Sequence, residues 1–338
     1  MGDSSAGKPA TTPQRRPVQA PELPEPPEPS HPFDEDDEAS FIGIQADQLK
    51  FLDTHTVQSS AVRVVPRVHA NVDAFANINA CTPEQLERLA NILEIRGAQP
   101  RQTKMREACF NAVGLKKGMS VLEIGAGTGV VARELARITG RDGRVVGIDV
   151  SLALLNYART RTTPGGVPID YRLGDAYNLD FQDNEFDASC SITLLAHIQN
   201  LDQVIREMIR VTRQTVMVLD QDYQTLVFEN SNTVLTRKIL QHGADYNVLD
   251  GWCGRKLPGL LVRHKLQNVQ CWPFVYAERD SHSYLITIAE RFAALAAQHG
   301  VITEDEAKVW LQELYDRAVD GTFFASLNYY FSFGNKKP

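Results

Sequence analysis

Residues 120 to 129, with the sequence SVLEIGAGTG, constrain the fold of this chain more than any other segment. Val121, Leu122 and Ile124 form a short apolar run of the kind buried in a parallel sheet. Glycines follow at positions 125, 127 and 129, and an apolar helical pattern starts at Val130. The segment therefore predicts a strand, a glycine turn and a helix, which together present backbone N–H groups beside the positive end of a helix.

The spacing of the glycines argues against a nicotinamide dinucleotide. The fingerprint G-x-G-x-x-G needs its third glycine three residues after the second, where this chain has Val130. Glu123 stands two residues before the first glycine, where a carboxylate would repel a pyrophosphate but accept a cation. S-adenosylmethionine carries a sulfonium and an ammonium group and no phosphate, so its charge suits this turn.

On these residues the chain resembles the class I S-adenosylmethionine-dependent methyltransferases, in the style of the small-molecule enzymes of ubiquinone and menaquinone biosynthesis. The family signature, hydrophobic-hydrophobic-acid-hydrophobic-G-x-G-x-G, is matched in full from Val121 to Gly129. The resemblance covers about residues 101–225 well and the C-terminal third loosely. It implies an α/β fold with a Rossmann-like doubly wound seven-stranded sheet of order 3-2-1-4-5-7-6, with N-terminal lid helices and a C-terminal helical cap.

Strand and helix patterns alternate through the middle of the chain, as a parallel sheet requires. We expect strands at 120–124, 144–149, 169–173, 186–193 and 216–220, and helices at 128–139, 151–160 and 200–211. Upstream, the sequence TPEQ at 82–85 predicts a capping box at a helix start. Further elements are expected as a helix at about 102–113, an apolar segment at 269–277, helices near 283–298 and 304–318, and a final strand at 323–333.

The first 40 residues differ from the rest in composition. They hold nine Asp or Glu against three Lys or Arg, and nine of the 17 prolines, so they carry most of the net charge of −7. Such a segment buries too little apolar surface to offset its ordering entropy. We therefore predict a disordered tail at 1–40, a helical lid region at 41–114 and a methyltransferase catalytic domain at 115–338 with a helical insertion at about 282–320.

The resemblance also implies which residues contact the cofactor. Asp149 ends the second strand and would accept hydrogen bonds from the ribose hydroxyls, and Asp175 would accept one from the adenine amino group. A helix cap and an ordinary turn are the alternative roles for these two residues. The full predicted cofactor set is Glu123, Gly125, Gly127, Asp149, Val150, Asp175, Ala176 and Ile192.

Catalytic residues are harder to predict, because methyl transfer depends mainly on alignment. His197 follows the fourth strand and could act as a general base, with packing as the alternative. Asp222 and Tyr223, with Asp220, follow the predicted fifth strand at the end where α/β sheets bind ligands. We assign His197, Asp222 and Tyr223 to the catalytic site.

Two further groups of residues have an open role. Tyr246, Trp252 and Arg255 either line the acceptor pocket or belong to a surface loop. The polar residues of the second lid helix either meet the methionine carboxylate of the cofactor or are solvated helix charges: Arg101, Gln102 and Arg106.

The leading hypothesis is a methyltransferase that uses S-adenosylmethionine to methylate a small, largely apolar metabolite, in a secondary-metabolite pathway. The alternatives are a cyclisation or rearrangement on the same fold, or a regulatory methyltransferase-like protein. We expect no metal. We expect no nucleic-acid partner, because no basic patch is present, and no membrane span, because no apolar run of about 20 residues is present. Five cysteines without a CxxC pair favour the cytoplasm. The tail would solubilise the chain or, as the alternative, bind a protein partner.

Overall fold

The computed structural model describes residues 73–161, 166–279 and 283–337. The predicted tail at 1–40 and the segment 41–72 of the predicted lid region lie outside these residues. The statements below concern the described residues only.

The described residues alternate between strands and helices in the order expected for residues 120–211. In chain order, the elements of the first part are η2 (Ile78–Ala80), α1 (Pro83–Ala98), α2 (Pro100–Ala112), β1 (Ser120–Ile124), α3 (Val130–Thr139), β2 (Arg144–Asp149), α4 (Leu152–Arg161), β3 (Ile169–Leu173), β4 (Phe186–Ile192), η3 (Leu195–His197) and α5 (Leu201–Val211). The second part consists of β5 (Thr212–Phe228), α6 (Thr233–Tyr246), α7 (Cys253–Arg263), β6 (Gln267–Glu278), α8 (Tyr284–Gln298), α9 (Glu304–Asp320) and β7 (Ala325–Asn335).

The strands form one sheet of order β3-β2-β1-β4-β5-β7-β6, which confirms the predicted topology. Strands β1 to β5 pair in parallel, and β7 lies antiparallel between β5 and β6. Strand β1 is central: Leu122 lies opposite Val146 on β2 and Ser189 on β4. Its apolar residues are fully buried, as expected for a strand covered on both faces.

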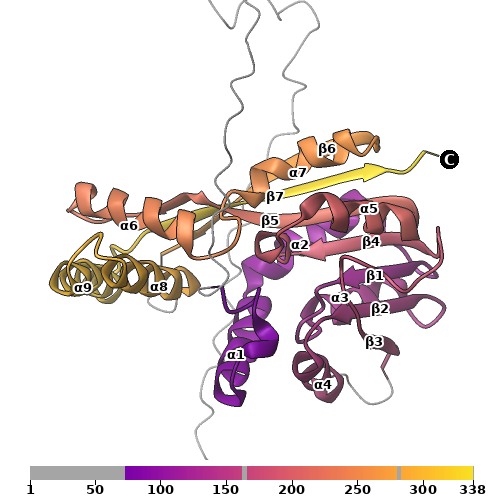
Figure 1. Ribbon diagram of the computed structural model, residues 1–338, viewed down its shortest axis with the longest axis horizontal. Helices are drawn as coiled ribbons and strands as arrows, with labels where there is room; N and C mark the ends of the chain where they lie inside the picture. The colour runs from indigo at the N-terminus through magenta and orange to yellow at the C-terminus, as the bar shows by residue number, and fades with distance from the viewer. Residues whose placement is uncertain (1–72, 162–165, 280–282, 338) are drawn as a thin grey trace, which may run out of the picture. The chain divides into compact units, whose positions relative to one another are not determined.

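Helix α1 begins at the predicted capping box. The hydroxyl of Thr82 accepts a hydrogen bond from the Gln85 amide at 3.3 Å, and the Gln85 side chain accepts one from the Thr82 amide at 2.8 Å. Helix α1 then packs against α2, α3 and α4. Figure 1 shows α1 beside the carboxyl ends of the strands in the first half of the sheet.

The C-terminal helices form a separate layer. Helix α6 packs against β5 and α8, and α9 packs against α6 and α8, so that the three helices lie together to one side of the strands in Figure 1. Their centre contains the largest buried side chains of this part, Phe292 and Trp310. Strand β7 adds Tyr329 and Phe331, both fully buried, to the core.

Strand β5 is much longer than the predicted segment 216–220. It continues through Asp220, Gln221 and Asp222, which are polar but almost completely buried. Hydropathy does not mark such residues as a strand, since buried polar groups are identified by their hydrogen-bond partners and not by their type.

Helices α6 and α7 are not predicted by the sequence. Helix α7 carries Pro258 in its interior and two glycines, Gly254 and Gly259, all of which lower helix propensity. Gly254 has a packing reason, because a Cβ there would lie 3.0 Å from the carbonyl oxygen of Asp220 on β5. Close contact between helix and strand therefore overrides local propensity.

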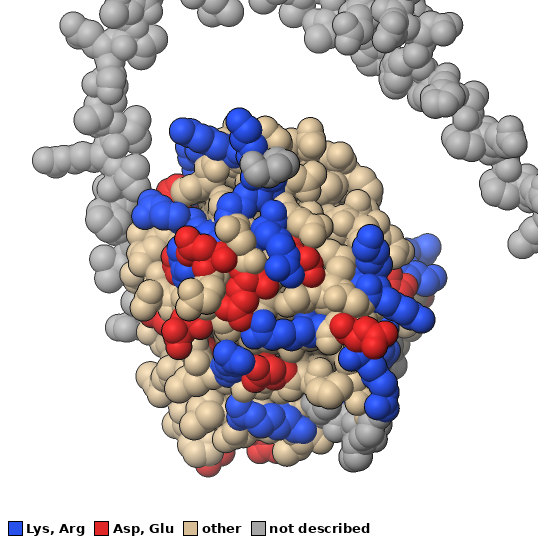
Figure 2. Space-filling model, turned by 90° about the vertical axis from the view of Figure 1, so that its right-hand side faces the viewer, with Lys and Arg blue, Asp and Glu red and all other residues tan. Residues whose placement is uncertain are grey.

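Charged side chains of both signs are mixed over the face of the protein shown in Figure 2. The basic residues there stand beside acidic ones, so this face has no single-sign field across its described residues. Among the helices of the described ranges, none combines the length and the apolar character that crossing a membrane would require.

Candidate cofactor and acceptor site

The turn after β1 wraps around the end of β2. Both Gly125 and Ala126 donate backbone hydrogen bonds to the carbonyl oxygen of Ile148, at 2.9 and 2.8 Å. Gly125 has a φ of +79°, and a Cβ there would lie 2.9 Å from the side chain of Leu194. Glycine is therefore needed both for the backbone conformation and for the space above the turn.

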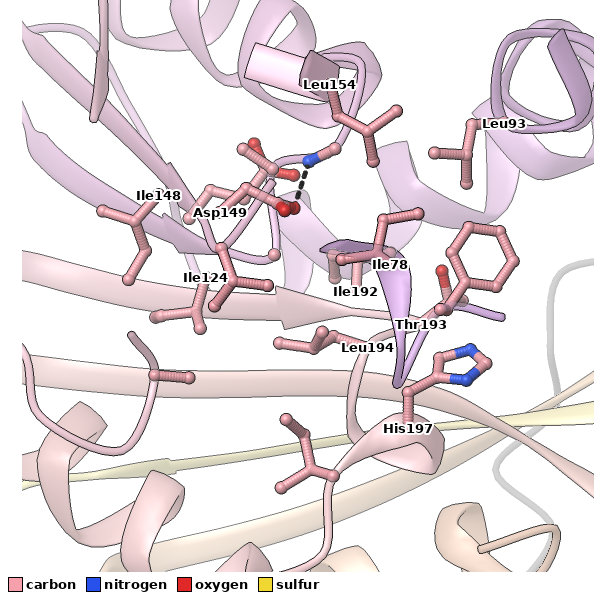
Figure 3. A pocket seen from close by; sticks show the side chains of 18 of the residues that line it. Ile78, Leu93, Ile124, Ile148, Asp149, Leu154, Ile192, Thr193, Leu194 and His197 are labelled. Carbon is pink, nitrogen blue, oxygen red and sulfur yellow. Dashed lines mark hydrogen bonds between the residues drawn. The ribbon is translucent and has the colours of Figure 1, made fainter. Parts of the chain in front are cut away.

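A cavity of about 390 Å³ opens above this turn. Its walls come from the carboxyl ends of β1, β2 and β4, which is where open α/β sheets bind ligands. Helix α1 and residues 75–78 form the opposite wall. Figure 3 shows Asp149 and His197 at separate parts of the wall, with Ile192 and Leu194 between them.

The structure brings all eight predicted cofactor residues to this one cavity. They come from β1, the glycine turn, the end of β2, the turn after β3 and the end of β4: Glu123, Gly125, Gly127, Asp149, Val150, Asp175, Ala176 and Ile192. Residues up to 69 positions apart in the sequence therefore line a single cavity.

Asp149 connects the second strand to the glycine turn. Its Oδ2 atom accepts a hydrogen bond from the Gly127 amide at 2.8 Å, and its Oδ1 atom accepts one from the Ser151 amide at 2.9 Å. Burial raises the pKa of Asp149, and these amide hydrogen bonds oppose that shift. The carboxylate is thus fixed in direction at the edge of the cavity.

Glu123 gives the cavity a buried acid. Glu123 is 2% exposed, and its Oε2 atom has no hydrogen-bond partner among the described residues. Burial raises the pKa of Glu123 well above its usual range, and the negative charges of Glu134 and Asp149 raise it further. A cation at this position would stabilise the ionised carboxylate and supply the missing partner. The buried acid therefore fits a ligand with a sulfonium or ammonium group.

His197 is held by a carboxylate that the sequence does not reveal. Its Nδ1 atom lies 2.7 and 2.9 Å from the two carboxylate oxygens of Asp73, and both residues are largely buried. Asp73 also accepts hydrogen bonds from the amides of Phe75, Ala76 and Leu249. These bonds and the histidine lower the pKa of Asp73, although burial opposes the shift. His197 lines the cavity, and its orientation is set by Asp73.

Comparison with known proteins decides between the ligands that such a turn could bind. Residues 121–215, which contain the turn, Asp149 and Asp175, match the family described as "Methyltransferase domain". The chain carries a class I methyltransferase domain. The cofactor of that class is S-adenosylmethionine, which agrees with the charge and the glycine spacing of this site.

Three bacterial proteins are similar to this chain. The chain is 33% identical over 157 residues to the methyltransferase GfsG of Streptomyces halstedii, covering 43% of this chain and 56% of GfsG. It is 34% identical to the demethylmenaquinone methyltransferase of Desulfitobacterium hafniense, over 35% of this chain and 47% of that enzyme. An uncharacterized 37.1 kDa protein of transposon TN4556 from Streptomyces fradiae is 25% identical over 74% of this chain and 71% of its own length. The chain thus spans about half the length of the two named enzymes.

Solved structures with a similar chain path include a putative methyltransferase from an antibiotic biosynthesis pathway of Anabaena variabilis. It has a TM-score of 0.49 and 18% identity, and covers 68% of this chain and 96% of its own. The [4+2]-cyclase SpnF has a TM-score of 0.42 and 20% identity, with 69% and 80% coverage. Similarity at this level carries no argument about the reaction.

Asp222 and Tyr223 do not line this cavity, so their assignment to the catalytic site stays a prediction without support from its geometry. Asp222 is fully buried and forms an ion pair with Arg255. Tyr223 is 3% exposed, and its hydroxyl accepts a hydrogen bond from Gln221 at 2.6 Å. Both residues are buried because β5 extends past the predicted end of the strand and carries them into the interior.

The structure also moves the predicted acceptor-pocket residues away from the cavity. Tyr246 stacks on His242 with ring centroids 4.4 Å apart. The guanidinium of Arg255 lies 4.5 Å from the ring centroid of Trp252 and pairs with Asp222. Helices α6 and α7 both pack on β5, and Tyr246, Trp252 and Arg255 do not line this cavity.

The three polar residues of α2 have different partners. Arg106 lines the cavity but forms a two-point ion pair with Glu134 at 2.7 Å for each contact. Arg101 donates to the carbonyl oxygen of Ala277, outside the cavity. Gln102 lines the cavity and donates to the hydroxyl of Tyr329 at 3.1 Å. Arg101 is therefore not placed to meet the cofactor in this structure.

Sequence patterns miss three residues of the site: Arg96 and Thr193, which line the cavity, and Asp73, which contacts the lining residue His197. Asp73 and Arg96 have no motif around them, and only the topology brings them to the site. Thr193 has one structural signal, a φ of +57°, which is rare for a β-branched residue and absent from any sequence pattern. Among the residues the structure describes, no group of three or more His, Cys, Asp or Glu is placed to hold a metal ion.

Proposed function

We propose that this chain transfers the methyl group of S-adenosylmethionine to a small, largely apolar metabolite. The single observation that carries the proposal is the convergence of the glycine turn, Asp149 and Glu123 on one cavity within a methyltransferase domain. A phosphate-bearing nucleotide would place its negative charges near the unpartnered Glu123 and be disfavoured there.

The cofactor residues would act by position and charge. Asp149 would accept hydrogen bonds from the ribose hydroxyls, and Asp175 would accept one from the amino group of the adenine. Val150 and Ala176 would flank the adenine ring. Glu123 would face the cationic methionine end. When bound, the cofactor supplies a methyl group on a positively charged sulfur. The contribution of the protein is to align the acceptor and exclude water, which is worth on the order of 7–11 kcal/mol of barrier in well-oriented reactions.

His197 would act as a base and take a proton from the methyl acceptor. Asp73 holds Nδ1, so that Nε2 is the nitrogen left for a substrate, and the carboxylate stabilises the imidazolium that proton uptake produces. The nearby Asp220 adds a second negative charge, since it interacts electrostatically with His197. A hydroxyl or an activated carbon acid as acceptor would need such a base.

The character of the acceptor follows from the remaining wall of the cavity. That wall is mainly aliphatic and aromatic and includes Phe75, Ile78, Leu93, Leu194, Ile198 and Leu249. Such a surface favours an apolar ring or chain by burial. The match to a demethylmenaquinone methyltransferase adds support for a ring-shaped metabolite of quinone or secondary-metabolite type.

Incubation of the full chain with methyl-labelled S-adenosylmethionine and a panel of phenols, quinols and polyketide-like acids tests the proposal. We expect label in a product whose mass is greater by one methylene group. A product of unchanged mass would identify a rearrangement or cyclisation, and no product from any acceptor would count against the proposal.

Removal of residues 1–40 should leave turnover unchanged, whereas loss of activity or of a bound protein would assign the tail a recruiting role.

A further inference from the structure

The cavity contains one guanidinium that no described carboxylate neutralises. Arg96 of α1 lines the cavity, and its Nη2 atom donates to the Thr193 hydroxyl at 2.8 Å. Its second side-chain partner is the Tyr284 hydroxyl. The other arginine of the cavity wall, Arg106, is paired with Glu134. Arg96 is therefore the cationic side chain of the described wall that remains available to a ligand.

The surroundings of Arg96 are polar but neutral. Two buried tyrosines, Tyr223 and Tyr329, lie close enough to interact with it electrostatically. Burial raises the pKa of both hydroxyls, so neither is a phenolate near neutral pH. Arginine keeps its charge in proteins, and a partly buried charge without a counterion is costly. An anion entering the cavity would remove that cost.

Thr193 is held in an unusual conformation beside this guanidinium. Its φ of +57° is left-handed, which a β-branched residue adopts only when its surroundings enforce it. The Thr193 amide donates to the carbonyl oxygen of Leu219 at 2.7 Å, and its hydroxyl accepts from Arg96. Strained residues of this kind concentrate at ligand sites. In this conformation the Thr193 hydroxyl lies 2.8 Å from Nη2 of Arg96.

The position of Arg96 favours the acceptor over the cofactor. The cations that act most strongly on Glu123, the residue expected to face the cofactor's charged end, are Arg106 and Arg133. The partners of Arg96 come instead from the end of β4 and from α8, and His197 follows Thr193 by four residues. Arg96 thus belongs with the residues on the His197 side of the cavity.

We propose that Arg96, with Thr193, forms an anion subsite that holds a carboxylate or similar oxyanion of the methyl acceptor. The forked guanidinium suits such a two-oxygen group, because it can donate two parallel hydrogen bonds. The substrate class is then an apolar ring or chain that carries an acidic group. This inference rests on the proposed methyltransferase function and adds the charge of its substrate.

Calorimetry with 1-naphthoate and the isosteric 1-naphthamide tests the subsite, in protein with and without S-adenosylhomocysteine. The wild type should bind naphthoate at least tenfold more tightly than naphthamide. Arg96→Met should abolish that preference and Arg96→Lys should reduce it, while both leave S-adenosylhomocysteine affinity within about twofold. Arg88→Met, at an exposed position of the same helix, is the matched control and should change neither ligand.

The outcomes separate this inference from the proposed function. Equal or absent binding of the two naphthyl probes by the wild type would overturn the subsite. A tenfold loss of S-adenosylhomocysteine affinity in both Arg96 variants, with naphthoate preference kept, would overturn it by assigning Arg96 to the cofactor. Failure of the wild type to bind S-adenosylhomocysteine would instead contradict the methyltransferase function, and the cofactor-free titrations would still report on the subsite.

Discussion

Asp73 and His197 are 124 residues apart in sequence, yet a carboxylate oxygen of Asp73 lies 2.7 Å from Nδ1 of His197. The pair joins the segment before η2 to the 3-10 helix η3 after β4. A contact between two distant segments therefore orients a histidine of the cavity wall, and under the proposed function this histidine takes the proton of the methyl acceptor.

Replacing His197 by Gln should lower kcat by about 10²- to 10⁴-fold, because a positioned general base typically contributes that much. Asp73→Asn keeps the size of the side chain but removes its charge, and should cost roughly tenfold in kcat. Turnover with an acceptor identified by the labelling screen gives the measurement. S-adenosylhomocysteine affinity is the control and should be unchanged in both variants. Turnover of His197→Gln within twofold of the wild type would assign His197 a packing role.

Asp149→Ala should weaken S-adenosylhomocysteine binding by about 5- to 150-fold, which corresponds to roughly 1–3 kcal/mol for lost buried hydrogen bonds. The variant also removes the acceptor that holds the Gly127 amide, so Asp149→Asn, which keeps one oxygen, should lose less. Asp170→Ala on the neighbouring strand β3 is an exposed control. Titration calorimetry measures all three. Equal affinities for Asp149→Ala and Asp170→Ala would remove Asp149 from the cofactor site.

Removing one partner of the Arg106–Glu134 pair should be costly, because Arg106 is 4% and Glu134 9% exposed. Glu134→Gln leaves the guanidinium without its charge partner, and we expect a loss of about 3–5 kcal/mol in the free energy of unfolding. Asp170→Asn breaks the exposed Arg172–Asp170 pair and should cost about 0–1 kcal/mol. Urea denaturation compares the two. Similar losses would show that burial does not strengthen the Arg106–Glu134 pair.

Asp220 should make stability depend on pH. Burial raises its pKa to about 6 from an ordinary value of 3.8, so the folded state binds a proton more tightly than the unfolded state. This contribution is fully present below pH 4 and is lost as the pH rises through about 6, with a total near 3 kcal/mol. The free energy of unfolding of the wild type, relative to Asp220→Asn, should therefore fall between pH 4 and pH 7.

Urea titrations at pH 5 and pH 7.5 give this comparison, with Asp305→Asn at an exposed helix position as the control. The control should show the same difference from the wild type at both pH values. A wild type that gains stability relative to Asp220→Asn at the higher pH would contradict the assigned direction of the pKa shift.

The sequence predicts the first half of the fold well because local and global signals agree there. The strand at 120–124 and the strand at 169–173 match the observed bounds, since short apolar runs between turn residues have no other stable burial. The capping box at Thr82 and Gln85 likewise fixes the start of α1 through contacts three residues apart.

The sequence does not predict the elements and site residues that are determined by tertiary contacts. Helix α7 keeps Gly254 because the helix lies against β5, and β5 keeps Asp222 because Arg255 of that helix pairs with it. A glycine does not indicate a helix in the sequence, and an aspartate does not indicate a buried strand. The cofactor half of the cavity follows from a local motif, whereas the fold alone brings Arg96 to the cavity wall and Asp73 to the lining residue His197.

Calorimetric titration of the cofactor-free chain with S-adenosylmethionine and, separately, with NADH tests the central claim most directly. Because the glycine turn faces the buried Glu123 and the edge carboxylate Asp149, we predict heat and saturable 1:1 binding with S-adenosylmethionine and none with NADH. Saturable binding of NADH together with no heat from S-adenosylmethionine would contradict the account.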